Sequence, residues 1–369
     1  MRNIFKLASL LTAAVMLFAC EKVGTTGDEL RIVSDKDVIQ ANGTDAANLQ
    51  VMLGDKDVTS ESVFYNENHE LLNVVDGKFT VTETGEHMIY ADYGTMSTYN
   101  KNAADNGLFM IKAINVPVPE LPVDADPANT SFVHRAMLTQ YTGTACPNCP
   151  RMTKIIRDIT AEGLIPAKAV HTAVHSYTSA DPMYISAPSA QYYPFLTVDN
   201  VQGFNAENGI QTLKGLIEEH SKGTAKAGIS VSPAYYEAEG TLVIKVAVKA
   251  AQDGIFNVGA WLLENDIYAQ QSDNSGIADK TYDIHENAVR IADSRYKGAF
   301  DGYPLGTLSA GEVAEKTFVM NLKSKWEVEN MHLAVFVLDG VKAGSRTDFS
   351  VCNVVDVPID APTPFEYAK

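Results

Sequence analysis

The sequence has only four cysteines in 369 residues, and it lacks a second long hydrophobic run after its first twenty residues. An exported protein built on a disulfide framework would carry more cysteines at wider spacings. Without another apolar run of about 20 residues, no transmembrane helix is expected in the remaining chain. Basic residues are also few, 29 against 46 acidic ones, which gives a net charge of −17. Such a charge disfavours nucleic acid and anionic membrane surfaces as partners.

The first twenty residues predict a secreted lipoprotein. Arg2 and Lys6 precede an apolar stretch that is too short to span a bilayer, which is typical of a signal peptide. The stretch ends in Leu17-Phe18-Ala19-Cys20, which resembles a lipobox. We therefore expect cleavage after residue 19, lipid on the Cys20 thiol, and attachment to the outer membrane on its periplasmic or surface face. The alternative is an ordinary signal peptide that happens to contain a cysteine.

The remaining chain is too long for one compact core and predicts several domains. After a lipidated tether over residues 20–28, residues 29–115 read as short strands separated by turns such as Asn42-Gly43, which favours a β-sandwich. The segment FTVTETGEHMIYADYG resembles bacterial immunoglobulin-like domains, which implies a binding platform or a connecting unit. Four prolines between Pro117 and Pro127 predict a stiff, extended linker over residues 116–130.

Residues 131–225 change to alternating strands and helices. A predicted strand, FVHRAMLTQY, is followed by the CPNC sequence in a turn, and Pro150 begins a helix with Met152, Ile156 and Ile159 on one apolar face. Two more strands and a second helix follow, which is the order of a thioredoxin-like α/β domain. Residues 226–369 return to strands such as LVIKVAVKA, which predicts a C-terminal β-sandwich. The expected fold is therefore multidomain, with an α/β domain between two β-sandwiches.

The motif Cys146-Pro147-Asn148-Cys149 carries the predicted chemistry. At a helix start the first cysteine lies against unpaired backbone N–H groups and the positive end of the helix dipole, which favour the thiolate. Cys146 would then be the attacking nucleophile, and Cys149, one turn later, would resolve the mixed disulfide. In thioredoxin-like folds a cis-proline begins the strand beside the redox motif, and Pro194, 48 residues after Cys146, fits that place. We therefore expect a cis Tyr193–Pro194 bond packed against this turn, where Tyr193 would contact an incoming peptide. The alternative is a trans proline that only begins a strand.

The motif and its surroundings resemble a known family. LTQYTGTACPNCP, followed by VHTAVH and YYPFLTVDN, is similar to the Omp28-related outer-membrane lipoproteins over roughly residues 130–360, with further landmarks at residues 285–290 and 304–306. The resemblance implies a thioredoxin-like core and an outer-membrane location. Gln140 stands where thioredoxins place a buried carboxylate that helps to deprotonate the resolving thiol. Because glutamine is not a base, efficient turnover as a thiol–disulfide oxidoreductase is not expected, although thiol exchange is.

Two histidines lie on one face of the strand that follows the motif helix, His171 and His175. We expect His175, nearer the end of the strand, to be a partly exposed histidine at a sheet end; the alternative is that it serves as a proton acceptor for the cysteines. A zinc or copper site made by these residues would normally include a second C-x-x-C pair, so we expect no metal and no other cofactor. Cys352 is expected to be a small buried residue.

Two main functions remain open at this stage. The first is thiol–disulfide exchange with cysteines of other envelope proteins, which the position of the motif at a helix start favours. The second is a structural or binding lipoprotein in which Cys146 and Cys149 form only a stabilising disulfide, which Gln140 and the two large β regions favour. A metal chaperone is a third alternative.

Overall fold

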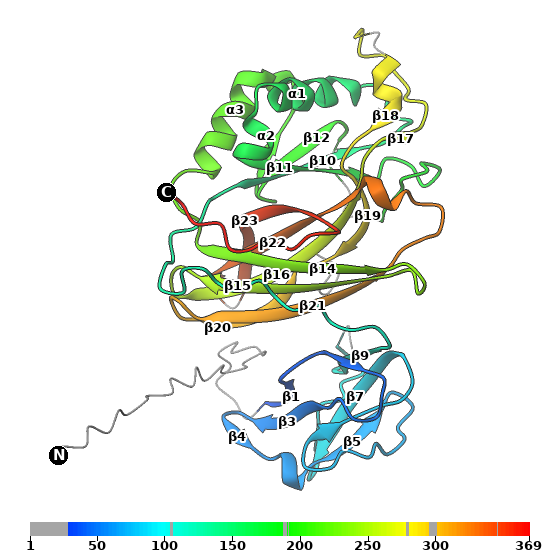
Figure 1. Ribbon diagram of the computed structural model, residues 1–369, viewed down its shortest axis with the longest axis vertical. Coiled ribbons are helices and arrows are strands. Elements are labelled where there is room, and N and C mark those ends of the chain that lie inside the picture. Colours follow the sequence, from blue (N-terminus) through cyan, green and yellow to red (C-terminus); the bar gives the residue numbers. More distant parts are fainter. Residues whose placement is uncertain are drawn as a thin grey trace, which may run out of the picture.

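The computed structural model describes residues 29–103, 106–186, 190, 192–277, 280–294, 301–344 and 346–369. The predicted signal peptide, the tether and Cys20 lie outside the described residues. Figure 1 shows a small N-terminal β unit below a larger body, in which helices lie above several β layers. The β-rich, multidomain organisation predicted from the sequence is therefore confirmed at this level.

The N-terminal unit consists of two small sheets that enclose one core, as the short alternating strands predict. Alternate residues of β3, such as Leu49 and Val51, point into this core and meet Ile89 and Ile111 of the other sheet. The first sheet contains β1 (Leu30–Ser34), β3 (Ala47–Leu53), β4 (Lys56–Asp57) and β6 (Lys78–Phe79). The second contains β2 (Val38–Gln40), β5 (Val63–Asn66), β7 (Gly85–Tyr93), β8 (Met96–Ser97) and β9 (Phe109–Ile114).

The larger body is organised by a nine-stranded sheet with the order β13-β12-β10-β11-β19-β16-β22-β23, in which β20 also pairs with β16. Strand β10 runs parallel to β11, and every residue of both strands is buried. The strands are β10 (Ala136–Thr142), β11 (Ala169–His175), β12 (Phe195–Val198), β13 (Gln202–Phe204), β16 (Gly254–Glu264), β19 (Ala288–Asp293), β20 (Tyr303–Leu308), β22 (Met331–Ala343) and β23 (Arg346–Pro358).

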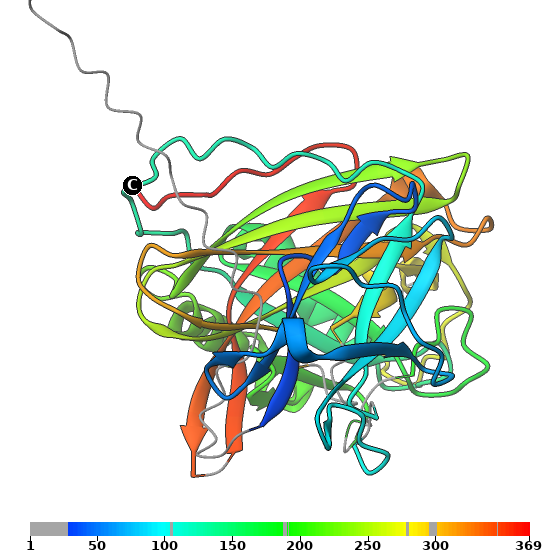
Figure 2. The ribbon, with the colours of Figure 1, turned by 90° about the horizontal axis from the view of Figure 1, so that it is seen from below.

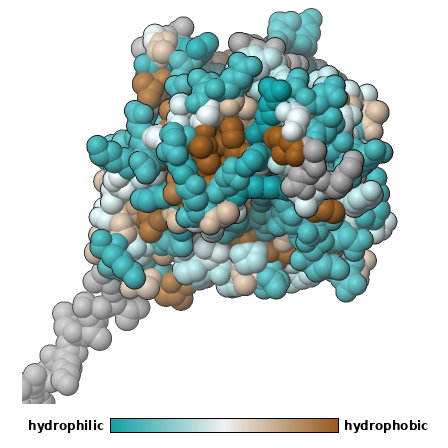
Figure 3. All heavy atoms as spheres, turned by 90° about the horizontal axis from the view of Figure 1, so that it is seen from above, coloured by the Kyte–Doolittle hydropathy of each residue, from teal (hydrophilic) through white to brown (hydrophobic). Residues whose placement is uncertain are grey.

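Helices cover one face of β10–β13, and other strands cover the opposite face. Helices α1 (Pro150–Ala161) and α3 (Gly209–His220), with the short α2 (Leu164–Ala167), pack their apolar sides on Leu138 and its neighbours. Met137, one residue earlier, faces the other way and meets Phe336 of β22. A separate sheet of β14 (Ala227–Tyr236), β15 (Thr241–Ala250) and β21 (Val313–Asn321) packs on the far side of β16 and β22. The face above the helices is mostly hydrophilic, with hydrophobic residues near its centre (Figure 3).

The regions predicted as central and C-terminal domains, residues 131–225 and 226–369, share one sheet and one core. Within the sheet, the two regions are joined where β11 runs beside β19, through the residue pair Ala173–Ala288. The shared core contains Val170 and Tyr141 from the first region and Trp261 from the second. The boundary at residue 225 stays a prediction, but the two regions pack as neighbours rather than as separate units.

The linker does not run freely between the two parts of the molecule. Lys249 of β15, which is only 1% exposed, donates from Nζ to Asp124 Oδ2 at 3.0 Å and to the Pro127 carbonyl at 2.6 Å. Tyr367, near the C-terminus, donates to Asp124 Oδ1 at 2.6 Å. Figure 2 shows the linker lying beside the C-terminal tail along the edge of the body.

The N-terminal unit contacts the three-stranded sheet directly. Lys112 of β9 donates to the Val319 carbonyl of β21 at 3.0 Å, and Asp37 forms an ion pair with Lys316. An apolar cluster that includes Val116 and Val243 surrounds these contacts. The two parts are therefore joined by polar and apolar contacts in addition to the linker.

Candidate functional site

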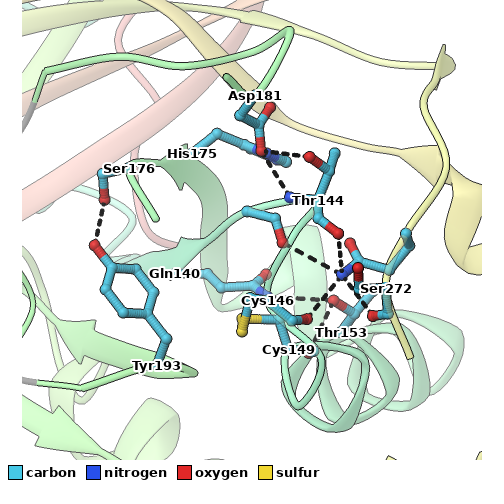
Figure 4. The surroundings of a disulfide bond; sticks show 12 residues. Gln140, Thr144, Cys146, Cys149, Thr153, His175, Ser176, Asp181, Tyr193 and Ser272 are labelled. Atoms are coloured by element: carbon cyan, nitrogen blue, oxygen red, sulfur yellow. Dashed lines mark hydrogen bonds and ion pairs between the residues drawn. A yellow bond between two sulfur atoms is a disulfide. The ribbon is translucent and has the colours of Figure 1, made fainter. Parts of the chain in front are cut away.

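The CPNC motif lies where the sequence places it, between the end of β10 and the start of α1. Cys149 is the N-cap residue of α1, and Pro150 is its first residue. Cys146 and Cys149 form a disulfide with a Cα–Cα distance of 5.4 Å (Figure 4). Both cysteines are about 1% exposed, so the oxidised pair is shielded from solvent.

Pro194 lies beside this motif and directly before β12. The Tyr193–Pro194 bond is cis, as the sequence predicts. A small cavity of about 110 Å³ is lined by Pro194 and Tyr193 on one side and by Asn148 and Arg151 on the other. The Tyr193 hydroxyl lies 2.9 Å from Ser176 Oγ, which fixes the outer end of the tyrosine. The structure thus brings the predicted peptide-contacting residues and the motif together; their role stays a prediction.

Gln140, which replaces the carboxylate of thioredoxins, is buried in a chain of hydrogen bonds. Its Nε2 donates to Thr153 Oγ1 at 3.3 Å, and the Thr153 hydroxyl in turn donates to the Cys149 carbonyl at 3.4 Å. Its Oε1 lies 3.0 Å from Nε2 of His171, whose Nδ1 lies 3.2 Å from Nδ2 of Asn287. Burial lowers the pKa of His171 to about 3, so the imidazole is neutral near pH 7. This chain fixes side chains behind Cys149 but contains no carboxylate.

His175 is almost fully buried, so the expectation of a partly exposed histidine is wrong. Its Nδ1 lies 3.0 Å from Oδ2 of Asp181, a residue that sequence reasoning did not single out. Asp181 also accepts from the backbone N–H groups of Thr144, at 2.6 Å, and Met183, at 2.9 Å. Burial raises the pKa of Asp181, but the donors outweigh it and hold this pKa below its usual range. His175 thus supports Asp181, which in turn positions the loop two residues before Cys146.

A second segment missed by sequence reasoning lies against the motif loop. It follows β17 (Ile267–Tyr268), which pairs with β18 (Ile284–His285), and we call its residues 269–276 the strap. The backbone N–H of Ser272 donates to the Thr144 carbonyl at 2.7 Å, and that of Asn274 donates to the Pro147 carbonyl at 2.8 Å. Figure 4 shows the motif between Tyr193 on one side and Ser272 on the other. No strand or helix period marks residues 269–276 in the sequence.

A cavity of about 330 Å³ lies behind the motif, between α1, β10, β11 and the segment that includes β18. Three histidines line it, namely His171, His175 and His285. Burial, together with the neighbouring His175, lowers the pKa of His285 to about 4. Arg157 of α1 closes one side by donating to the carbonyls of Thr281 and Ile284, at 3.0 and 3.1 Å. Within the described ranges no group of three or more histidine, cysteine, aspartate or glutamate residues could hold a metal ion.

Cys352 and the predicted landmark at residues 285–290 lie in packing contacts of the β-sheets. Cys352 is a free thiol buried in β23, as expected, and burial raises its pKa. Nε of Arg290 lies 3.1 Å from Oε2 of Glu264, and its guanidinium lies 4.9 Å from the centre of the Trp326 ring. These contacts join β19 to β16 and to the loop before β22.

Comparison with known proteins points to the outer membrane. The family model described as outer membrane protein Omp28 matches residues 185–362, a range that begins after the CPNC motif and includes both predicted C-terminal landmarks. Among solved structures, HBP35 of Porphyromonas gingivalis is similar, with 17% sequence identity, 63% of this chain and 78% of that chain covered, and a TM-score of 0.48. No curated protein matches the sequence. In the part of the chain that the structure describes, no helix is long and apolar enough to cross a membrane.

Proposed function

We propose that this chain is a lipid-anchored outer-membrane protein whose central region is thioredoxin-like and exchanges the Cys146–Cys149 disulfide with thiols of other envelope proteins. The observation that carries the proposal is the disulfide formed in the turn directly before α1, beside the cavity lined by Tyr193 and Pro194. The parallel pair β10–β11, the antiparallel β12 and the helices on one face support a thioredoxin-like region. The match to outer membrane protein Omp28 supports the location.

The exchange would proceed in two steps that balance in electrons. A thiolate of a reduced partner attacks Cys146 Sγ, a partner–Cys146 bond forms, and the Cys146–Cys149 bond breaks to release the Cys149 thiolate, which takes up a proton. A second partner thiolate then attacks the partner sulfur of this mixed disulfide and releases Cys146. The partner loses two electrons and gains a disulfide, and this chain gains two thiols. The N-terminus of α1, which begins directly after Cys149, would stabilise the Cys146 thiolate.

Trapping experiments test this function. Run in reverse, the exchange begins when the Cys146 thiolate attacks a partner disulfide and releases one partner thiolate, and the Cys149 thiol then resolves the mixed disulfide. In Cys149→Ser this resolving thiol is absent, so mixed disulfides on Cys146 should accumulate in cells and disappear on reduction. Non-reducing gels followed by mass spectrometry would identify the trapped proteins. Cys352→Ser, which removes a buried thiol far from the motif, is the matched control and should trap nothing. Absence of any reducible adduct with Cys149→Ser contradicts the proposal.

A purely structural disulfide is the second candidate, and it is favoured by the burial of both cysteines and by the neutral Gln140 behind them. The two candidate functions predict different reduction potentials for the Cys146–Cys149 disulfide. Structural disulfides of exported proteins lie below about −300 mV, whereas exchange proteins lie between about −120 and −270 mV. Equilibration of the protein with glutathione buffers would place the pair in one range or the other.

The lipid anchor has its own test. Cys20→Ser should move the protein from the membrane to the soluble envelope fraction, because a single sulfur would carry the anchor. Fractionation followed by immunoblotting measures the shift, and Cys352→Ser should stay with the membrane. Full membrane retention of Cys20→Ser contradicts the anchor.

A further inference from the structure

The strap contacts the motif loop through its backbone and through one side chain. Gln271 Nε2 lies 2.9 Å from the Cys146 carbonyl, 3.1 Å from that of Thr144 and 3.3 Å from that of Gly143. It also lies 3.0 Å from the Ser272 carbonyl of the strap itself. An amide nitrogen carries two hydrogens, so these carbonyls share two donors. Gln271 can therefore donate to two of these loop carbonyls at a time, and small movements of the loop decide which two.

The strap is also fixed to the body at its other side. The Gln271 backbone N–H donates to Asp283 Oδ1 at 2.8 Å, and that of Ala269 donates to the Asp283 carbonyl at the same distance. Arg157 holds the following segment on α1, the helix that starts at the disulfide. The strap therefore connects the loop before Cys146 to a fixed part of the same redox region.

We propose that Gln271 is a positioning residue that, through the strap, holds the motif loop closed over the Cys146–Cys149 disulfide, so that release of the strap controls how fast the disulfide is reduced. The loop carbonyls on both sides of Cys146 are hydrogen-bonded by the strap, and in this arrangement each cysteine is only about 1% exposed. An attacking group must approach a sulfur along the S–S axis, which requires the loop to move. Each hydrogen bond from the strap opposes that movement.

Three variants at neighbouring glutamines test the proposal. Gln271→Ala removes the donor, and Gln271→Glu keeps the size of the side chain but replaces the donor with a carboxylate facing the carbonyls. Gln270→Ala is the matched control, since Gln270 is exposed and its side chain forms no hydrogen bond or ion pair with the other described residues. The measurement is the rate at which a water-soluble phosphine reduces the pair in the full-length protein. The phosphine attacks one sulfur, and hydrolysis then yields two thiols and a phosphine oxide.

We expect Gln271→Ala to be reduced about tenfold faster than Gln270→Ala, since a factor of ten corresponds to about 1.4 kcal/mol, roughly one hydrogen bond. Gln271→Glu should be faster still, because it adds repulsion. A role in packing alone predicts the reverse order, with alanine faster than glutamate. That order, or rates within twofold of the control for both variants, overturns the proposal. Thermal unfolding of each oxidised variant checks that the fold is retained.

Hydrogen–deuterium exchange gives a second measurement that does not depend on reduction. The amides of Ser272 and Asn274 should exchange slowly in the wild-type protein and at least tenfold faster in Gln271→Glu, with no change in β15. Equal protection in both proteins contradicts the proposal. This inference rests on the disulfide of the proposed function, but the two can fail separately. If no partner is trapped while the expected order of reduction rates is observed, exchange with partners is wrong and the role of the strap in controlling reduction is retained.

Discussion

Replacing Lys249 by alanine should lower the free energy of unfolding by about 3 kcal/mol, because it leaves a largely buried carboxylate without its cation. The Lys249 ammonium is enclosed by Asp124, by the Pro127 carbonyl and by the Tyr367 hydroxyl, the last at 3.3 Å. The side chain of Asp124 is 21% exposed, so water compensates part of the loss and the estimate is taken at the low end of the range for buried pairs.

Lys245 provides the control for this substitution. It lies on the same face of β15, and its partner Glu315 is 3.1 Å away, but the two side chains are 24% and 38% exposed. Lys245→Ala should therefore cost less than about 1 kcal/mol. Urea unfolding of both variants measures the difference. Equal stabilities for the two variants would contradict the assignment of Lys249 as the residue that fixes the linker and the C-terminal tail.

Acidification from pH 6.5 to pH 4 should destabilise the protein, with a contribution on the order of 3 kcal/mol from His171 alone. The pKa of His171 is lowered to about 3 and that of His285 to about 4. In this window the unfolded state binds protons that the folded state does not, so stability falls as the pH falls. Asp181 acts in the same direction, but only below about pH 4, where its carboxylate becomes protonated in the unfolded chain.

His171→Gln tests this effect, because glutamine can still bond to Gln140 and Asn287 but does not titrate. The slope of stability against pH between 6.5 and 4 should become shallower than in the wild-type protein. His87→Gln, on β7 of the N-terminal unit, should leave the slope as it is. Chemical unfolding at several pH values measures both slopes. An unchanged slope in His171→Gln would show that the acid sensitivity arises elsewhere.

The features that could be predicted from the sequence are those with local signals. Pro150 directly after CPNC marks a helix start, and Met152, Ile156 and Ile159 repeat at helical spacing; all three are buried against the sheet. The cis Tyr193–Pro194 bond was predicted from the cis-proline of thioredoxin-like folds and from the place of Pro194 before an apolar run, 48 residues after Cys146. The four cysteines correctly separated the motif pair from the buried Cys352. For the start and the apolar face of α1, the deciding residues lie within about ten positions of one another.

The features that could not be predicted depend on residues far apart in the chain. LVIKVAVKA shows which face of β15 carries Lys249, but the linker that covers this face comes from more than a hundred residues earlier. The strap has no hydrophobic period, since it contacts the motif loop through backbone hydrogen bonds, which any side chain allows, and through the single polar side chain of Gln271. Asp181 becomes important only because folding brings it to Thr144 and His175. The shared sheet depends on the pair Ala173–Ala288, whose residues leave no sequence signal.

The contact between the N-terminal unit and β21 fixes the distance between that unit and the disulfide. The motif lies at the end of the body beside α1, and the N-terminal unit lies at the opposite end (Figure 1). Lys112, Asp37 and the apolar cluster around Val116 fix that unit on the three-stranded sheet. With a lipid on Cys20, a tether of nine residues can extend by at most about 30 Å. Under the proposed anchor, the tether would lead into the N-terminal unit, and the motif would lie at the opposite end of the folded chain.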